Sequence, residues 1–296
     1  MPRVITMPTS PNFVSSNFSL VRAVGFTESP FTGAYKTQEF ESVYWQSQVT
    51  LPRMKRATAV DWQAFFMQLK GPINYFKFAD PDALTNRGTY STAHLVSDPR
   101  INQTSVTLSF TASNSRVTAG SSVFGDLVTG DFIHITGPTK PENTGTFKVT
   151  NAVSGTVLEI SGDADILDES NVSSCKVRQN VKGASALSLE ASSNSATGTI
   201  LVGDYLQIQS AADTTSNPAQ LVQVVEAATE TSQGGSALNH FSLRIEPHLR
   251  ADFADGNYAV FTNPKGLFRL SENLANWDAD RNSNYSFSFS CVEVVT

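Results

Sequence analysis

Helical periodicity occurs in one stretch of this chain, Pro52-Arg-Met-Lys-Arg-Ala-Thr-Ala-Val-Asp-Trp-Gln-Ala-Phe-Phe-Met-Gln-Leu-Lys-Gly-Pro72. Its apolar residues recur at the i, i+3, i+4, i+7 spacing that gives a helix one broad apolar face. The stretch ends in Lys-Gly-Pro, a combination typical of a helix C-terminus. We therefore predict a helix over about residues 58–70, with Thr58 as its N-cap, and a sheet that its apolar face covers.

The apolar face of this helix is predicted to be structural core, because tertiary packing selects a stripe with this spacing. The strand that closes the chain alternates aromatic residues with serines, which indicates one buried face. The predicted core residues from these two elements are Trp62, Phe65, Phe66, Leu69, Phe287 and Phe289.

The rest of the chain has the pattern of β-strands, and its composition divides it into parts. Short segments rich in β-branched and aromatic residues, bounded by Pro, Gly, Ser or Asn, fill both ends of the chain. Between them, residues 98–244 are rich in Ser, Thr, Ala and Gly and contain few aromatic residues. We predict a mainly β fold in which residues 1–97 and 245–296 form one discontinuous β domain that the middle segment interrupts.

The middle segment contains an internal repeat. Gly130-Asp-Phe-Ile-His-Ile135 is echoed by Gly203-Asp-Tyr-Leu-Gln-Ile208, and similar strand-like segments surround both copies in the same order. In each copy the glycine supplies an unusual φ and the aspartate caps the turn with its side chain. The repeat predicts two small β lobes, each a barrel or a sandwich, at residues 98–180 and 181–244.

Composition and charge argue against a protein that grips nucleic acid. Charged residues make up 16% of the chain, below the roughly 25% of average proteins, and the net charge is −6. Neutralising phosphates needs clustered Lys and Arg, and the one cationic group in the sequence is Arg53, Lys55 and Arg56. A low charge with many Ser and Thr residues is more typical of an assembled or extracellular β protein than of a metabolic enzyme.

The sequence contains none of the common catalytic or cofactor motifs. It has no H-E-x-x-H, nucleophile elbow, phosphate loop or dinucleotide-binding turn, and Cys175 and Cys291 lie far apart. We predict no catalytic, cofactor-binding or metal-binding residue and no enzyme activity. The acidic segment Asp163-Ala-Asp-Ile-Leu-Asp-Glu169 could supply oxygen ligands to calcium or form a solvated loop, and it lacks the EF-hand spacing.

The order of several landmarks resembles a family of phage proteins. These landmarks include Pro30-Phe-Thr-Gly33, the helix with Asp61-Trp-Gln-Ala-Phe65, Phe76-Lys-Phe-Ala-Asp-Pro81, Gly266-Leu-Phe-Arg-Leu270 and Phe287-Ser-Phe-Ser-Cys-Val-Glu-Val294. Together they resemble the distal tail and tail-tip ring proteins of long-tailed, noncontractile (siphovirus-like) bacteriophages. The resemblance covers most of the predicted main domain and the second repeat.

This resemblance implies a β-sandwich or barrel of the tail-tube type flanked by one α-helix and interrupted by the two lobes. It implies a hexameric ring that joins the tail tube protein to the host-facing tail hub and other tail-tip proteins. Genomic DNA would pass through the ring only as cargo. The implied location is the virion tail, assembled in the host cytoplasm, without a membrane anchor.

A ring through which DNA slides should have an acidic lining, and a subunit interface should pair opposite charges. We therefore expect some of four acids to face the channel: Glu39, Glu41, Asp61 and Asp80. The cationic group formed by Arg53, Lys55 and Arg56 meets either carboxylates of a neighbouring subunit or only solvent.

Two other functions remain open at this stage. A carbohydrate-binding or host-adhesion module would need exposed aromatic platforms on the two lobes. A polysaccharide hydrolase would need two carboxylates facing each other in a cleft.

Overall fold

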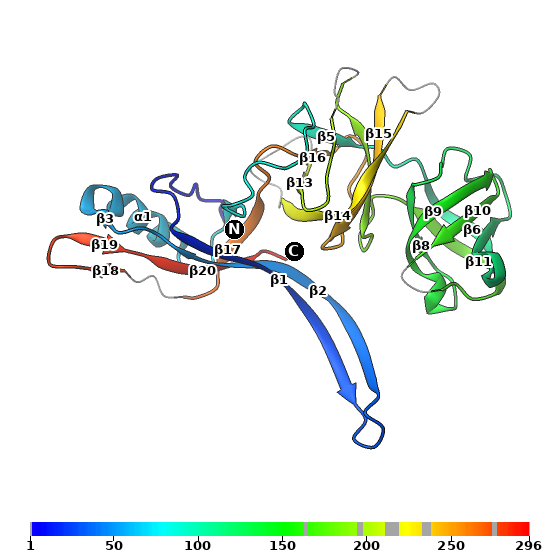
Figure 1. The fold of residues 1–296 in the computed structure, drawn as a ribbon, viewed down its shortest axis with the longest axis horizontal. Coiled ribbons are helices and arrows are strands. Elements are labelled where there is room, and N and C mark those ends of the chain that lie inside the picture. The colour runs from blue at the N-terminus through cyan, green and yellow to red at the C-terminus, as the bar shows by residue number, and fades with distance from the viewer. Residues whose placement is uncertain are drawn as a thin grey trace. The chain divides into compact units, whose positions relative to one another are not determined.

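The computed structural model describes residues 2–162, 165–193, 198–210, 219–232, 238–273 and 277–295, without the side chains of residues 39, 41 and 227–232. The described chain is mainly β, as predicted, with one α-helix and two short 3-10 helices, η1 (Ala112–Asn114) and η2 (Pro141–Asn143). It divides into two compact units (Figure 1). We call residues 1–84 with 265–296 the sheet unit, and residues 85–264 the barrel unit.

The sheet unit is built on a five-stranded antiparallel sheet in the order β1-β2-β20-β17-β4. The C-terminal strand β20 lies in the middle of this sheet, between β2 and β17, so both ends of the chain contribute to it. The strands are β1 (Ser15–Glu28), β2 (Tyr35–Thr50), β4 (Phe76–Phe78), β17 (Gly266–Leu270) and β20 (Ser288–Glu293).

Helix α1 (Arg56–Leu69) begins two residues before the predicted start. The prediction of Thr58 as N-cap is wrong: Lys55 is the N-cap residue, and its side chain makes no capping hydrogen bond. Strand β3 (Met54–Lys55) keeps the backbone extended up to that point, because it pairs with β19 (Asn284–Ser286). At the other end, Lys70 and Gly71 both have left-handed φ values, 53° and 66°, which stops the helix.

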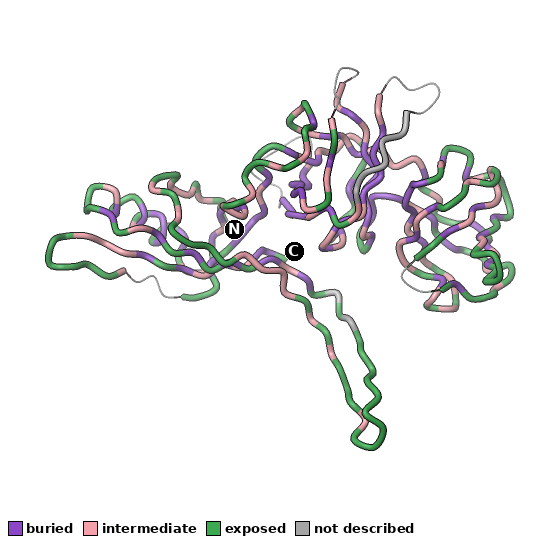
Figure 2. The backbone as a smooth tube through the Cα atoms, viewed as in Figure 1, coloured by how far each residue is buried: buried purple, intermediate pink, exposed green. Residues whose placement is uncertain are grey.

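The apolar face of α1 packs on one face of the sheet through aromatic rings. Trp62 lies against Phe289 with the ring centroids 6.4 Å apart, and Phe66 stacks on Phe287 at 5.9 Å. The six residues predicted as core are all buried: Trp62, Phe65, Phe66, Leu69, Phe287 and Phe289. Figure 2 shows the buried positions along α1 and the centre of the sheet.

The barrel unit consists of two closed six-stranded barrels. The first barrel has the order β10-β7-β6-β11-β8-β9, and the second has the order β12-β15-β14-β13-β16-β5. The first barrel contains β6 (Asn102–Thr111), β7 (Arg116–Ala119), β8 (Phe132–Thr136), β9 (Gly145–Ser154), β10 (Val157–Ser161) and β11 (Glu169–Arg178). The second contains β5 (His94–Ser97), β12 (Ala186–Ala191), β13 (Tyr205–Gln209), β14 (Gln220–Ser232), β15 (Asn239–Glu246) and β16 (Tyr258–Val260).

The boundary of the barrel unit differs from the predicted one. The sequence analysis placed residues 85–97 and 245–264 in the main domain, whereas the structure places them in the barrel unit. Strands β5 and β16 lie in these segments, pair with each other and close the second barrel against β12 and β13. A six-stranded closed sheet needs these two strands, and the four-strand repeat did not include them.

The two copies of the Gly-Asp motif form the same turn in the two barrels. Gly130 and Gly203 have φ values of 101° and 93°, which favour glycine. The carboxylates of Asp131 and Asp204 accept the backbone N–H three residues earlier, at 2.9 and 2.8 Å. Both aspartates are buried, so the motif closes a turn at the start of β8 and β13 rather than presenting acids to solvent.

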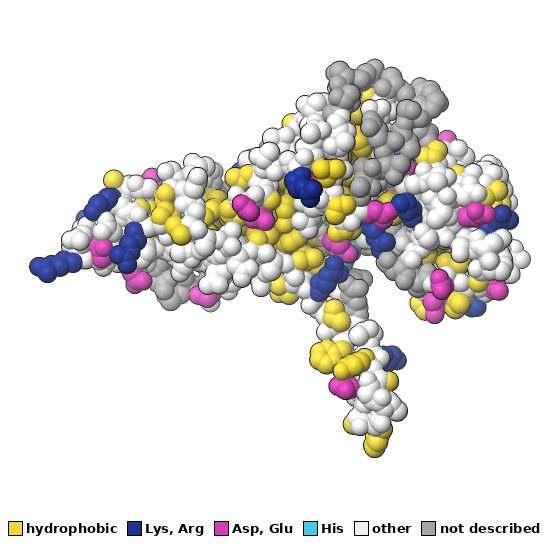
Figure 3. Space-filling view, in the orientation of Figure 1, with side chains coloured by type: hydrophobic (Ala, Val, Ile, Leu, Met, Phe, Trp, Pro, Cys, Tyr) yellow, Lys and Arg dark blue, Asp and Glu magenta, His cyan; other side chains and the backbone are white. Residues whose placement is uncertain are grey.

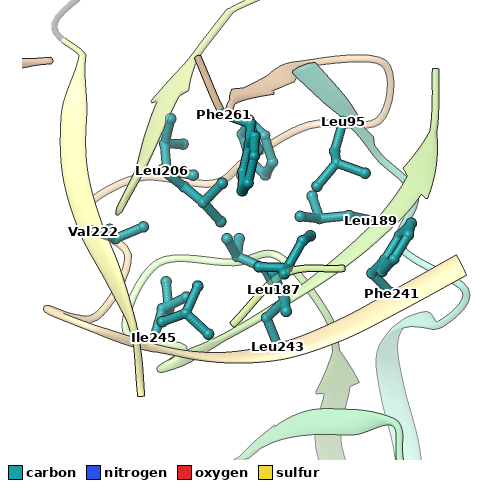
Figure 4. Close-up of a cluster of buried hydrophobic side chains, with 14 of the residues drawn as sticks. Leu95, Leu187, Leu189, Leu206, Val222, Phe241, Leu243, Ile245 and Phe261 are labelled. Atoms are coloured by element: carbon teal, nitrogen blue, oxygen red, sulfur yellow. The ribbon is translucent and has the colours of Figure 1, made fainter. Parts of the chain in front are cut away.

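The interior of the second barrel is filled by aliphatic and aromatic side chains from every strand (Figure 4). Leu95 of β5 and Leu189 of β12 are fully buried there and lie beside Phe261 and Phe241. The first barrel has an equivalent core around Leu108, so the described side chains fill both barrel interiors.

Replacing Phe66 by alanine should lower the free energy of unfolding of the sheet unit by about 3–5 kcal/mol, because it leaves a cavity between α1 and the sheet. Urea denaturation monitored by tryptophan fluorescence measures this loss of stability, since Trp45, Trp62 and Trp277 all lie in the sheet unit. The matched control is Met67→Ala, whose side chain on the same helix is 64% exposed. Equal losses for the two variants would contradict the assignment of the helix faces.

Replacing Asp204 by alanine should destabilise the second barrel by about 1–3 kcal/mol, because partly buried N–H groups lose their buried acceptor. The carboxylate accepts from Leu201, Arg87 and Gly88 at 2.7–3.3 Å. Hydrogen exchange of second-barrel peptides, followed by mass spectrometry, measures the loss. Asp204→Asn keeps one acceptor oxygen and should cost less; equal protection in wild type and both variants would refute this role.

Candidate functional site

The hairpin of β1 and β2 extends beyond the five-stranded sheet as a two-stranded ribbon (Figure 1). Strand β20 pairs with β2 only from Gln46 to Thr50, so the rest of the hairpin has no third strand among the described residues. We call its distal part, Arg22–Ser42, the arm. None of the described side chains of the arm is buried.

Local sequence explains why the arm forms a hairpin. Its two strands are joined at Ser29-Pro-Phe-Thr-Gly33, where Gly33 donates its N–H to the carbonyl of Ser29 at 2.9 Å. Gly33 has a φ of 65°, which a glycine adopts without strain. The carbonyl of Ala34 accepts the N–H of Ser29 at 2.9 Å, so the tip is closed by hydrogen bonds on both sides.

Large apolar side chains on the arm are exposed to solvent. Phe31 at the tip is 94% exposed, and the other four are 49–72% exposed: Val24, Phe26, Tyr35 and Phe40. Figure 3 shows hydrophobic side chains along the projecting hairpin. Aromatic residues gathered on an exposed surface are typical of a site that another protein covers.

The register of the arm places these side chains on both of its faces. Phe26 lies opposite Thr37 and Glu28 lies opposite Tyr35, so Phe26, Glu28 and Tyr35 share one face. The ring of Phe40 lies on the other face, 3.2 Å from where a Cβ on Gly25 would be. A ribbon two strands wide has no interior, so the arm cannot bury these residues within itself.

The second feature of the sheet unit is a hollow of about 340 Å³ on its sheet. Tyr44, Arg269 and Val292 alternate with core residues along their strands, so they point to the face opposite α1. Arg269 and Val292 are direct partners in the register of β17 and β20. The complete lining is Ser42, Tyr44, Tyr75, Arg269, Val292, Glu293, Val294 and Val295.

Two of the three predicted interface cations contact a turn of their own chain. Arg53 lies 3.9 Å from the carboxylate of Asp280, and Lys55 donates to the carbonyl of Asn282 at 3.3 Å. Asp280 lies in the turn between β18 (Asp278–Ala279) and β19, where hydrogen bonds from Asn284 hold the pKa of its carboxyl below the usual range. Arg56, the first residue of α1, is exposed.

The structure does not bring the four predicted channel acids together as one cluster. Asp61 is exposed on α1, and Asp80 is half-buried in a turn where its carboxylate accepts the N–H of Asp82 at 3.2 Å. Glu39 and Glu41 belong to β2 within the arm, and their side chains lie outside the described residues.

A Ser-His-Asp grouping lies where the two barrels meet, but its geometry is not that of a nucleophile and its base. The hydroxyl of Ser188 donates to the carbonyl of Asp98 at 2.6 Å, so its single proton points away from the imidazole. His240 Nε2 therefore donates to Ser188 Oγ at 2.9 Å, and Asp98 Oδ2 approaches the same nitrogen at 3.8 Å. Ser188 and His240 are 1% and 2% exposed, which also keeps a substrate out.

Two histidines at this junction are held neutral. Burial lowers the pKa of His240 to about 3, assisted by the charge of Arg100, so its approach to Asp98 is not an ion pair at neutral pH. Burial also lowers the pKa of His134 to about 4, with contributions from Arg178 and His248. His134 Nδ1 and the hydroxyl of Thr146 form a hydrogen bond of 3.1 Å. The same hydroxyl accepts the N–H of Ser185, which directly precedes β12 of the second barrel.

Asp168 and Glu169 of the acidic segment accept hydrogen bonds from backbone N–H groups and from one side-chain amide. Asp168 accepts the N–H of Ala112 at 2.7 Å, and Glu169 accepts from Thr139 and Asn143 at 2.8 Å. Asp163 lies outside the described residues. Among the residues that are described, no group of His, Cys, Asp and Glu could hold a metal ion, and no helix is long and apolar enough to cross a membrane.

Sequence reasoning did not single out the aromatic residues of the arm. It treated residues 29–33 as a turn between two short strands, and alternation alone does not say what covers an apolar face. A detectable signal was present: Phe26 and Tyr35 flank the turn, and Phe31 lies within it, where solvated turns are usually polar.

Acid should destabilise the barrel unit through His134 and His240. Their pKa values are lowered on folding, so the unfolded state binds protons more readily and stability falls as pH drops below about 6.5. Each histidine contributes at most ~1.4 kcal/mol per pH unit. Urea unfolding of the whole chain between pH 7.5 and 5 can be monitored by hydrogen exchange of peptides from the barrel unit. The His134→Gln and His240→Gln variants should lose less stability on acidification than the wild type. Stability that falls with pH equally in the variants and the wild type would contradict this.

Comparisons with protein-family models and with curated protein sequences each found no match. The arm and the hollow are therefore interpreted from their own geometry and chemistry. The arm carries exposed apolar side chains, and the hollow combines tyrosines and valines with the exposed Arg269.

Proposed function

We propose that this chain is a structural subunit of the tail tip of a long-tailed, noncontractile bacteriophage. In this role its copies form a ring that joins the tail tube to the host-facing hub and lets DNA pass. The observation that carries the proposal is the arm, which holds five large exposed apolar side chains on a ribbon that cannot bury them.

Self-association gives these side chains a partner without requiring a second kind of protein. A ring of identical subunits needs a heterologous contact, in which one surface of a copy meets a different surface of the next. The arm and the rest of the sheet unit supply two such different surfaces. The helix and sheet behind the arm are packed with buried aromatic rings, which gives the arm a rigid base.

The low charge and net acidity of the chain are compatible with a DNA passage. A net charge of −6 per copy, repeated around a ring, repels the phosphate backbone and keeps DNA from adhering. Asp61 is exposed on α1 and so is free to face a channel, whereas Asp80 is half-buried and engaged in its turn.

The carbohydrate-binding alternative has less support. Most aromatic residues of the barrel unit are buried, and Tyr258 is half-buried against the ring of His94. The buried ones include Tyr90, Phe110, Phe124, Phe132, Phe147, Tyr205, Phe241, Phe253 and Phe261. Sugar recognition by stacking needs exposed rings, so we do not extend the proposal to the barrels.

Light scattering with negative-stain imaging tests the ring. The wild-type chain should form a closed oligomer, and a variant in which Asn-Gly replaces residues 23–42 should be monomeric with unchanged unfolding. Arg22 and Val43 are register partners, so a two-residue turn can join them without distorting the sheet.

Two results would contradict the proposal. One is a wild-type protein that stays monomeric at high micromolar concentration. The other is parent phage particles whose tail tips are not labelled by antibodies raised against the purified chain.

A further inference from the structure

The hollow on the sheet unit offers apolar side chains and a positive charge, which suit the exposed face of the arm. Its lining combines the rings of Tyr44 and Tyr75 with aliphatic side chains such as Val292. Arg269, whose side chain is exposed, brings a positive charge to the same place. The apolar surface continues past the hollow through Val4, which is 39% exposed and forms a β-bridge with Tyr75.

The arm face that carries Phe26 and Tyr35 also carries Glu28 near its tip. Glu28 lies opposite Tyr35 in the register, next to the turn that holds Phe31, and it is exposed. A docked arm would thus present two aromatic rings and a carboxylate together. The hollow presents two tyrosines, valines and a guanidinium, which complement that face. The carboxylate in its lining, Glu293, is 2% exposed and accepts the N–H of Trp45 at 3.2 Å.

The arm of a copy cannot reach the hollow of the same copy. Both involve β2: Tyr44 lines the hollow together with Ser42 at the base of the arm, whereas Tyr35, near the tip, is the first residue of the strand and lies nine residues away. At about 3.3 Å per residue, an extended strand separates them by roughly 30 Å. The tip points away from the hollow along the strand, so only the hollow of another copy is available to it.

We propose that the arm of one copy docks in the hollow of a second copy, with Phe26 and Tyr35 against Tyr44 and Tyr75, and Glu28 paired with Arg269. This inference rests on the proposed function, because it names the two surfaces through which copies join. The contact is heterologous, so each copy gives one arm and receives one. A closing ring then repeats the same pair of surfaces at every interface.

Charge reversal tests the pairing directly. Glu28→Arg and Arg269→Glu should each weaken self-association at least tenfold, as measured by mass photometry across a dilution series, because each places like charges together. Both side chains are exposed, so the fold should persist, and circular dichroism checks it. Asp278→Arg and Arg281→Glu, two exposed reversals outside the arm and hollow, should leave assembly unchanged.

Mixing the two variants gives the sharpest readout. Each variant alone brings two like charges together at every interface. In the mixture, the arm of the Glu28→Arg variant can meet the hollow of the Arg269→Glu variant, and the unchanged Glu28 can meet the unchanged Arg269. The mixture, and the double variant Glu28→Arg with Arg269→Glu, should both recover assembly. If the single variants failed to assemble because they were unstable, combining them would not restore assembly.

The outcomes separate this inference from the proposed function. A wild type that assembles while both reversals leave assembly unchanged overturns the inference and leaves the ring in place. Weakened single variants without recovery in the mixture also overturn it, because the two residues then do not face each other. A wild type that does not self-associate overturns the ring and the inference together.

Discussion

The sheet unit depends on one constraint: a β-ribbon two strands wide has two faces and no interior. Within the sheet, α1 covers one face with Trp62 and Phe66 and so produces a core. Beyond the sheet no helix of the described chain covers the ribbon, and Phe26 and Phe31 stay in solvent. The sheet therefore buries its apolar side chains within the chain, whereas the arm can bury its apolar side chains only against another surface.

As far as it is described, the barrel unit leaves neither open strand edges nor an uncovered apolar face in its two closed sheets. Each barrel closes its sheet, so its strand edges are paired and its apolar residues lie inside. The buried aspartate of each Gly-Asp turn satisfies backbone N–H groups at the start of β8 and β13, where the chain enters the barrel wall. Among the residues described in the barrel unit, the large apolar side chains that stay exposed are Val153, Leu167, Val202 and Val225, and none of them is aromatic.

Sequence reasoning succeeded where the signal was local or repeated. The helix and the buried faces of Phe287 and Phe289 follow from periodicity, and the two barrels follow from two copies of one motif. It did not find β5 and did not assign the strand at Tyr258–Val260, β16, to a barrel, because the two are short and pair across more than a hundred residues of intervening chain. Nor could it identify the arm, because an alternating strand looks the same whether its own chain or another molecule covers it.

Charges on the arm explain how an exposed apolar ribbon can remain selective. Arg22, Glu28 and Lys36 interrupt its apolar residues, and a charged residue on an open strand edge opposes indiscriminate pairing with other strands. A partner surface must therefore offer both apolar contact and an opposite charge. The hollow does so through Tyr44, Tyr75 and Arg269, whereas a generic sheet edge or an uncharged apolar patch would leave Glu28 desolvated without a partner.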